Sequence, residues 1–205
     1  MSWLDRLASP AAKATDEPTP EDEGTERAAP GLASLFASLH ADGRHSVLDF
    51  GPAEGRRLRL LGRYARQVRF AALVPHPPRG SELTAALDDL EPDPDRRFDV
   101  VLVWDLFDRL DEAERRQVVE RVIDVTEPAA RLYAVVESSD AVSTRPIRTE
   151  LLDVDTVREA PVGPPEPSRP QLLPAHMERL VNPFEVLTGV SLRRGLREYV
   201  ARRPY

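Results

Sequence analysis

The sequence predicts an α/β protein built on a mostly parallel sheet with helices on both of its faces. Along residues 47–136, short and almost entirely apolar runs alternate with segments whose apolar residues recur at helical spacing. Near-continuous apolar strands are typical of a sheet covered on both faces, and their alternation with amphipathic helices indicates parallel βαβ units. The last segment, 186–202, instead fits two strands around an Arg194-Gly195 turn, so we expect a C-terminal antiparallel hairpin.

Each element follows from a local pattern. A first helix is expected over residues 32–39, where apolar residues recur at helical spacing and Asp42-Gly43 ends the pattern. The strongest helix pattern covers 111–125. Asp111 and Glu114 form a capping-box pattern at its start. The four central strands are expected at 47–50, 69–74, 99–104 and 132–136, further helices at 54–65, 81–90 and 172–181, and an irregular hairpin at 148–162.

The helix expected at 54–65 has an apolar face and an arginine face. Apolar residues at helical spacing predict that their face is buried. The arginine face is most simply a solvated surface, and the alternative is a binding surface for an anionic substrate or a partner. The residues expected to be buried are Leu58, Leu61, Tyr64 and Ala65, and those expected to be exposed are Arg56, Arg59, Arg63 and Arg66.

Residues 1–30 are expected to form a tail outside one folded domain, 31–205. From residue 8 to about residue 30 the chain holds prolines, alanines and acids but no large apolar side chain. Such a segment buries too little surface to offset the entropy cost of ordering, so we expect disorder. Ahead of it, Trp3, Leu4 and Leu7 fit one amphipathic turn, which is either a frayed terminus or a short peptide that docks on a protein partner or touches a membrane.

Composition excludes several classes of function. A net charge of −7 disfavours nucleic-acid binding, which needs a basic surface. The absence of cysteine excludes disulfides and zinc-thiolate sites, and the scattered histidines offer no metal site. No apolar run approaches the roughly 20 residues of a membrane span, and residues 1–10 lack the pattern of a secretion signal. We therefore expect a cytoplasmic protein without a metal ion.

The candidate site lies just after the strands, because ligands of open α/β sheets bind outside the carboxyl ends of the strands. Asp49 ends the first strand and is followed by Gly51, Ala53 and Gly55. Glycines at this place let the backbone turn sharply and approach a ligand closely. Trp104 and Asp105 end the third strand, and Asp105 is either a site residue or a simple helix cap.

Three blocks in order resemble class I S-adenosylmethionine-dependent methyltransferases, which have a Rossmann-like fold. VLDFGPAEG is similar to the first motif of that family, and FDVVLVWDLFDRLDEAERRQVVERV is similar to its fourth-strand block. The closing SLRRGLREYVARRP is similar to its final hairpin. The resemblance spans roughly residues 32–205 and is nearest to bacterial members with a GPAxG-type loop.

The resemblance implies S-adenosylmethionine as the cofactor and a small molecule as the methyl acceptor. Asp49 would hold the amino end of the cofactor, and the loop of Gly51, Ala53 and Gly55 would line its methionine and ribose portions. Asp105, with Trp104, would lie near the sulfonium and the acceptor. Because the sulfonium is already activated, positioning would be the main contribution of the protein.

Several positions depart from the family pattern. The acid that would accept the ribose hydroxyls after the second strand is missing from VRFAALVPHPP, where His76 is the nearest polar side chain. The gap between Val74 and Phe98 is short, so the third strand of the family is expected to be missing or vestigial. Losing a charge-assisted ribose contact costs about 2–3 kcal/mol, which predicts weak binding.

Two interpretations of the function remain open. One is a methyltransferase that acts on a small molecule. The other is a non-catalytic module with the methyltransferase fold that has lost the cofactor. A nucleotide-binding dehydrogenase is disfavoured, because that site also needs an acid after the second strand.

Overall fold

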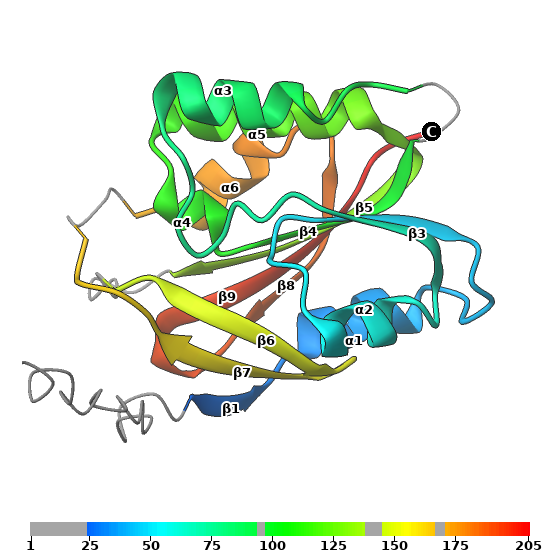
Figure 1. Cartoon of the computed structure of the whole chain (residues 1–205), viewed down its shortest axis with the longest axis horizontal. Coiled ribbons are helices and arrows are strands. Elements are labelled where there is room, and N and C mark those ends of the chain that lie inside the picture. Colours follow the sequence, from blue (N-terminus) through cyan, green and yellow to red (C-terminus); the bar gives the residue numbers. More distant parts are fainter. Residues whose placement is uncertain (1–23, 94–96, 138–144, 167–170) are drawn as a thin grey trace, which may run out of the picture.

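The computed structural model describes residues 24–93, 97–137, 145–166 and 171–205, and its centre is a six-stranded sheet (Figure 1). The strands are β2 (His45–Asp49), β3 (Ala65–Phe70), β4 (Phe98–Trp104), β5 (Thr126–Glu137), β8 (Glu185–Ser191) and β9 (Leu196–Arg202). Their order is β3-β2-β4-β5-β9-β8. The first four strands are parallel, whereas β9 runs antiparallel to both β5 and β8. The mostly parallel sheet and the C-terminal hairpin are thus confirmed.

Helices cover both faces of this sheet, as the alternation predicted (Figure 1). One face carries α1 (Pro30–Ala37) and α2 (Gly55–Leu61), and the other carries α3 (Gly80–Asp88), α5 (Glu112–Val125) and α6 (Pro174–Leu180). The short helix α4 (Leu106–Arg109) follows β4 directly. The predicted capping box of α5 is present, since Asp111 accepts a bond from the Glu114 amide and Glu114 accepts one from the Asp111 amide.

The second strand differs from the prediction in position and place. It was expected at 69–74 as a central strand, but β3 covers Ala65–Phe70 and lies at the edge of the sheet. The expected helix 54–65 is correspondingly too long, because α2 ends at Leu61. Residues 71–74 leave the sheet to cross the end of β2, where the amides of Leu73 and Val74 both donate to the Phe50 carbonyl.

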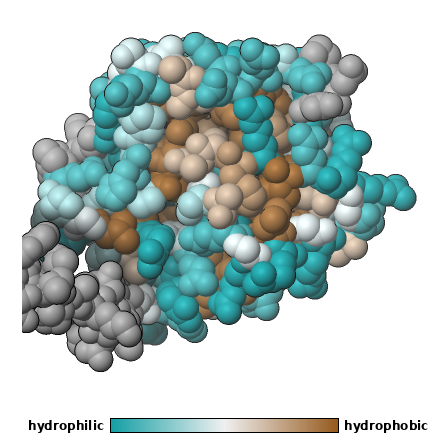
Figure 2. Space-filling model, viewed as in Figure 1, coloured by the Kyte–Doolittle hydropathy of each residue, from teal (hydrophilic) through white to brown (hydrophobic). Residues whose placement is uncertain are grey.

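No described strand pairs with the outer side of β3, in agreement with the expected loss of one strand of the family. The edge strand contributes the partly buried side chains of Val68 and Phe70 to the core. Figure 2 shows apolar side chains gathered in the middle of this view, between the polar surfaces of α3 and α2.

A second, three-stranded antiparallel sheet lies beside the main one. It has the order β1-β7-β6, formed by β1 (Thr25–Ala28), β7 (Thr156–Pro161) and β6 (Ile147–Asp153). The hairpin of β6 and β7 is the irregular hairpin expected at 148–162. The prediction of disorder up to residue 30 is wrong for residues 24–29, because pairing with β7 satisfies the backbone of β1. Residues 1–23, including Trp3, Leu4 and Leu7, lie outside the described residues.

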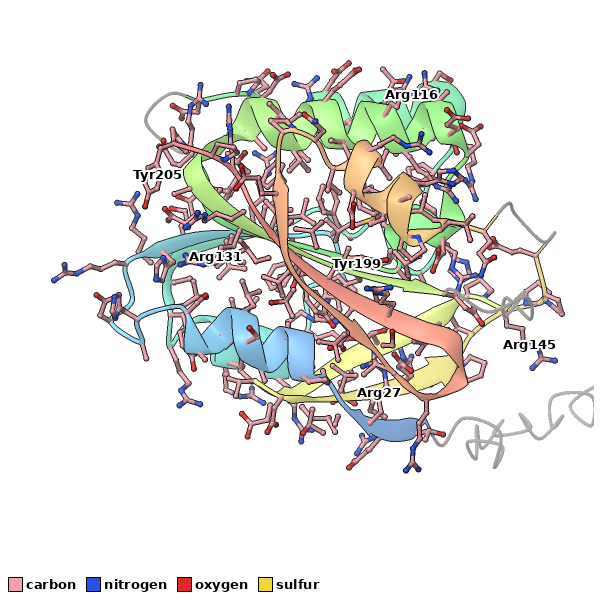
Figure 3. The ribbon with its side chains drawn as sticks, turned by 180° about the vertical axis from the view of Figure 1, so that it is seen from behind. Arg27, Arg116, Arg131, Arg145, Tyr199 and Tyr205 are labelled. Atoms are coloured by element: carbon pink, nitrogen blue, oxygen red, sulfur yellow. The ribbon has the colours of Figure 1, made fainter. Side chains whose placement is uncertain are left out.

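A buried carboxylate joins this small sheet to the main one. Glu198 of β9 is fully buried and accepts hydrogen bonds from the Gly31 amide at 2.6 Å, Arg27 Nη1 at 2.7 Å and the Tyr133 hydroxyl at 2.9 Å. Arg27 also pairs with Glu159 of β7, and it lies between β1 and the β8–β9 hairpin (Figure 3). Both oxygens of Glu198 therefore have partners, and one residue connects β1, α1, β5 and β9.

Candidate active site

Asp49 occupies the position at the carboxyl end of β2 that the sequence predicted for it, and its side chain is completely buried. Its Oδ1 accepts hydrogen bonds from Trp104 Nε1 at 2.6 Å, the Gly51 amide at 2.7 Å and Arg57 Nη1 at 3.3 Å. The ends of β2 and β4 are thus linked directly, as expected for neighbouring parallel strands. Asp49 and Trp104, with its neighbour Asp105, belong to one region.

Arg57 of α2 is the unexpected member of the site. Only 1% of its side chain is exposed, and its guanidinium lies over the Trp104 ring, 4.6 Å from the ring centre. A second guanidinium nitrogen donates to the Thr149 carbonyl of β6. A Cβ on Gly51 would lie only 1.6 Å from Arg57 Nη1, so the guanidinium fills the space directly over Gly51.

Two polar atoms of this ion pair have no hydrogen-bond partner among the described residues. They are Oδ2 of Asp49 and Nε of Arg57, and both are buried. Burial raises the pKa of Asp49 above its ordinary value, against the opposing effects of Arg57, Trp104 and the Gly51 amide. A buried polar atom without a partner is rare in proteins and indicates a place that a ligand can occupy. Oδ2 of Asp49 is a hydrogen-bond acceptor, which suits a cationic or hydrogen-donating ligand.

The backbone of Trp104 is also unusual. Its φ angle is +59°, in the left-handed region that side chains other than glycine seldom adopt. Such a conformation costs about 1–3 kcal/mol and is concentrated at functional sites. The angle turns the chain at the end of β4, and the indole is buried between Arg57 and Tyr133.

A cavity of about 260 Å³ opens beside Trp104, between the end of the main sheet and the small sheet. Asp105 lines it and pairs with Arg109 at 3.1 Å, while Oδ1 of Asp105 has no partner among the described residues. Asp105 makes no side-chain cap to α4, so the simple capping interpretation is not supported. The other lining residues are Trp104, Asp108, Arg109, Val135, Glu137, Ile147, Thr149, Glu159, Pro161 and Leu196.

Asp108 gives this cavity a group that titrates near neutral pH. Its Oδ2 accepts a hydrogen bond from the Glu137 amide at 2.7 Å. Burial raises the pKa of Asp108 to about 7, because the loss of water around the carboxylate outweighs that hydrogen bond. Burial likewise raises the pKa of Asp105, against the opposing effect of Arg109. A carboxylate of this pKa can accept a proton at physiological pH.

The predicted loop from Gly51 to Gly55 does not line the cavity beside Trp104. Ala53 and Gly55 are exposed at the start of α2, and neither they nor Gly51 line the cavity beside Trp104. We expected a pocket where the loop from Gly51 to Gly55 faces Asp105, and Arg57 and Thr149 lie in that place instead. His76 is exposed and pairs at 3.7 Å with Glu166, on a loop after β7, so it is turned to surface residues.

Sequence reasoning missed Arg57 and Asp108. Arg57 was overlooked because the apolar face of its helix was placed on Leu58, which is 51% exposed, whereas Arg57, Leu60 and Leu61 are buried. Their i, i+3, i+4 spacing was a usable signal, but a charged residue at such a position is not assigned to a core by pattern alone. Asp108 carries no signal in its local sequence, because its burial depends on β5 and the small sheet.

The residues that the structure describes include neither a grouped set of metal ligands nor a membrane-spanning helix. Among the described residues, no three histidine or acidic side chains are grouped to hold a metal ion. No helix of this part of the chain is long and apolar enough to cross a bilayer.

Solved structures show which fold this is, whereas no family model and no curated protein matches the sequence. The 1,6-didemethyltoxoflavin-N1-methyltransferase of Burkholderia thailandensis, solved with 1,6-didemethyltoxoflavin and S-adenosylhomocysteine, matches with a TM-score of 0.50 and 21% identity. The match covers 86% of this chain and 77% of that one. The N-methyltransferase NodS of Bradyrhizobium japonicum WM9, in complex with S-adenosylhomocysteine, matches with a TM-score of 0.51 and 14% identity, covering 86% of each chain.

These matches agree with the three sequence blocks and with the strand order. The resemblance predicted the same family from VLDFGPAEG, the block around Trp104 and the final hairpin, and each of these segments lies where that prediction requires. The chain therefore has the fold of the class I S-adenosylmethionine-dependent methyltransferases.

Proposed function

We propose that the chain is an S-adenosylmethionine-dependent methyltransferase that methylates a small molecule carrying an amine. The observation that carries this proposal is the buried Oδ2 of Asp49, an unsatisfied acceptor at the end of β2 beside Gly51. The family resemblance assigns the amino end of the cofactor to this carboxylate. An ammonium group would supply the hydrogen-bond donor that the atom lacks.

The chemistry of the residues suits the cofactor, but the space is closed. Asp49 and the glycine backbone offer an anionic acceptor and close approach. The guanidinium of Arg57 fills the volume over Gly51, so the cofactor fits only after Arg57 has moved. When bound, the cofactor supplies a methyl group on an activated sulfonium, and the protein would mainly position the acceptor.

The cavity beside Trp104 is the proposed acceptor site. Four of its lining residues are acidic, namely Asp105, Asp108, Glu137 and Glu159, against the single basic Arg109. An excess of carboxylates favours an acceptor with a positive charge or hydrogen-bond donors. Both of the matched enzymes described above are named as methyltransferases of a nitrogen atom, which supports a nitrogen acceptor.

Asp108 is the proposed proton acceptor. An ammonium group has no lone pair with which to attack a methyl group, so the acceptor must first lose a proton. The pKa of about 7 makes Asp108 basic enough to take this proton and acidic enough to release it to water. Asp105, held in place by its hydrogen bond from Arg109, would position the acceptor.

Calorimetric titration with S-adenosylmethionine tests the proposal. We expect the wild type to bind in the range of tens of micromolar, because no acid follows β3 to hold the ribose. Asp49→Asn should weaken binding about tenfold or more, since it removes a charge-assisted hydrogen bond. Asp42→Asn, at a partly exposed carboxylate before β2, is the matched control and should bind as the wild type does.

The titration also separates the two interpretations of the function. No binding by the wild type at millimolar cofactor would overturn the proposal and favour the non-catalytic module. Binding that is equally strong in Asp49→Asn would show that the cofactor uses another site.

A further inference from the structure

We propose that Arg57 is a built-in competitor for the cofactor, which occupies the cationic position at Asp49 and separates the cofactor site from the acceptor cavity. This inference rests on the proposed function. It assigns to Arg57 a role that the family resemblance does not contain, because the resemblance named no residue of α2 other than Gly55.

Arg57 lies where a cationic ligand would lie. Its guanidinium is within 3.3 Å of Asp49 Oδ1, rests on the face of Trp104 and fills the space over Gly51. The resemblance assigns this same carboxylate to the ammonium of the cofactor and this same glycine to its methionine portion. The space over Gly51 cannot hold both the guanidinium and the methionine portion of the cofactor, so the cofactor has to displace the side chain.

The ion pair is also poorly suited to be a permanent structural contact. Two buried charges gain from pairing only when their remaining polar atoms are hydrogen-bonded, and here Asp49 Oδ2 and Arg57 Nε are not. The fully bonded Glu198 shows that this protein can satisfy a buried carboxylate completely. A contact with unsatisfied atoms is one that a better partner can replace.

A displaced Arg57 has another partner at the N-cap of its own helix. Glu54, at position i−3, has a buried Oε2 with no hydrogen bond from any described residue. Glu54 is the N-cap and Arg57 the third residue of the helix, two positions whose side chains and backbones lie close together at a helix start, so a rotamer change can bring the guanidinium to Glu54. The charge of Arg57 then remains paired after the cofactor has entered.

Movement of Arg57 would also change the acceptor cavity. Thr149 and Trp104 both line that cavity, and Arg57 contacts both of them from the side of Gly51. When the guanidinium leaves, the bond to the Thr149 carbonyl is broken and the barrier between Gly51 and the cavity is removed. Cofactor binding and the position of β6 are therefore coupled, which favours binding of the cofactor before the acceptor.

The test compares Arg57→Met with the matched control Arg59→Ala, which removes an exposed arginine from the same helix. Methionine keeps much of the buried stem volume but has no charge. We expect Arg57→Met to bind S-adenosylmethionine about tenfold more tightly than the wild type, and Arg59→Ala to bind as the wild type does. Without cofactor, amides of residues 147–153 should exchange hydrogen faster in Arg57→Met than in the wild type.

The outcomes distinguish the inference from the proposed function. Wild-type binding with equal or weaker binding by Arg57→Met would overturn the inference and leave the methyltransferase proposal standing. Absence of binding in both proteins would overturn the proposed function and the inference with it. If Arg57→Met does not fold, Arg57→Lys serves in its place, since it keeps the charge but loses the two-sided contact. Its affinity should then lie above that of the wild type, and an unchanged affinity would again overturn the inference.

Discussion

Asp49 and Glu198 are two completely buried carboxylates, each paired with an arginine, but their surroundings differ. Glu198 receives hydrogen bonds on both oxygens, from Arg27, Tyr133 and the Gly31 amide. Asp49 receives three bonds on Oδ1 and none on Oδ2 from the described residues. Both carboxylates are completely buried and both pair with an arginine. What distinguishes them is that Oδ2 of Asp49 has no hydrogen bond from a described residue, whereas both oxygens of Glu198 do.

This difference indicates that the ion pair of Glu198 stabilises the fold, whereas the ion pair of Asp49 belongs to a ligand site. A fully bonded network fixes the elements that it joins, whereas a half-bonded one leaves an acceptor that a ligand can complete. The location agrees with this division. Glu198 joins the small sheet to the main sheet, while Asp49 lies at the carboxyl end of a parallel strand, where ligands of such sheets bind.

The largest difference between the two carboxylates is expected in stability. Glu198→Gln should lower the free energy of unfolding by about 3–5 kcal/mol, because it removes the charge of a completely buried carboxylate and leaves the partly buried charge of Arg27 with only Glu159. Asp49→Asn should cost less, about 1–2 kcal/mol, since Arg57 can turn to Glu54 and the asparagine oxygen still accepts from Trp104. Urea unfolding measures both values, and equal losses would contradict the division between a structural and a ligand-binding pair.

The glycine beside each carboxylate provides a smaller contrast. A Cβ on Gly31 would lie 2.7 Å from Cβ of Glu198, where little can move, whereas one on Gly51 would meet the flexible end of Arg57. Gly31→Ala should therefore cost about 1–3 kcal/mol and Gly51→Ala less. Thermal unfolding of the two variants is the measurement, and a greater loss in Gly51→Ala would mean that Arg57 is fixed in place.

Asp108 is a further carboxyl, partly buried, whose effect should appear in the pH dependence of stability. Its folded pKa of about 7 lies above the ordinary value of 3.8, so the folded protein keeps a proton that the unfolded chain releases. Stability from this group is complete below about pH 4 and is lost as the pH rises to about 7, by less than ~1.4 kcal/mol per pH unit. Asp108→Asn should remove that decline. If the free energy of unfolding changes with pH in the same way in the variant and the wild type, the pKa of Asp108 is not raised.

Local patterns were sufficient to predict the frame of the molecule. The parallel strands, the hairpin at 186–202 and the capping box at Asp111 and Glu114 all depend on nearby residues. Asp49, Trp104 and Asp105 could be located as well, because the ends of neighbouring parallel strands meet at one edge of the sheet.

The predictions were wrong, or missed a residue, where contacts with residues distant in the sequence determine the structure. Residues 25–28 have the composition of a tail, but pairing with β7 makes them a strand. The position of β3 depended on a turn after Leu61 and on hydrogen bonds to Phe50. Arg57 is buried because Asp49 and Thr149 compensate its charge, and no pattern within α2 contains those partners.

We infer that the half-bonded Asp49 is a ligand site, which Arg57 covers until the cofactor displaces it. A crystal structure of the wild-type protein with S-adenosylhomocysteine tests this most directly. We expect the ammonium of the ligand within hydrogen-bond distance of Asp49 Oδ2, and the guanidinium of Arg57 turned away from Gly51. A ligand bound elsewhere, or one bound while Arg57 still covers Gly51, would contradict it.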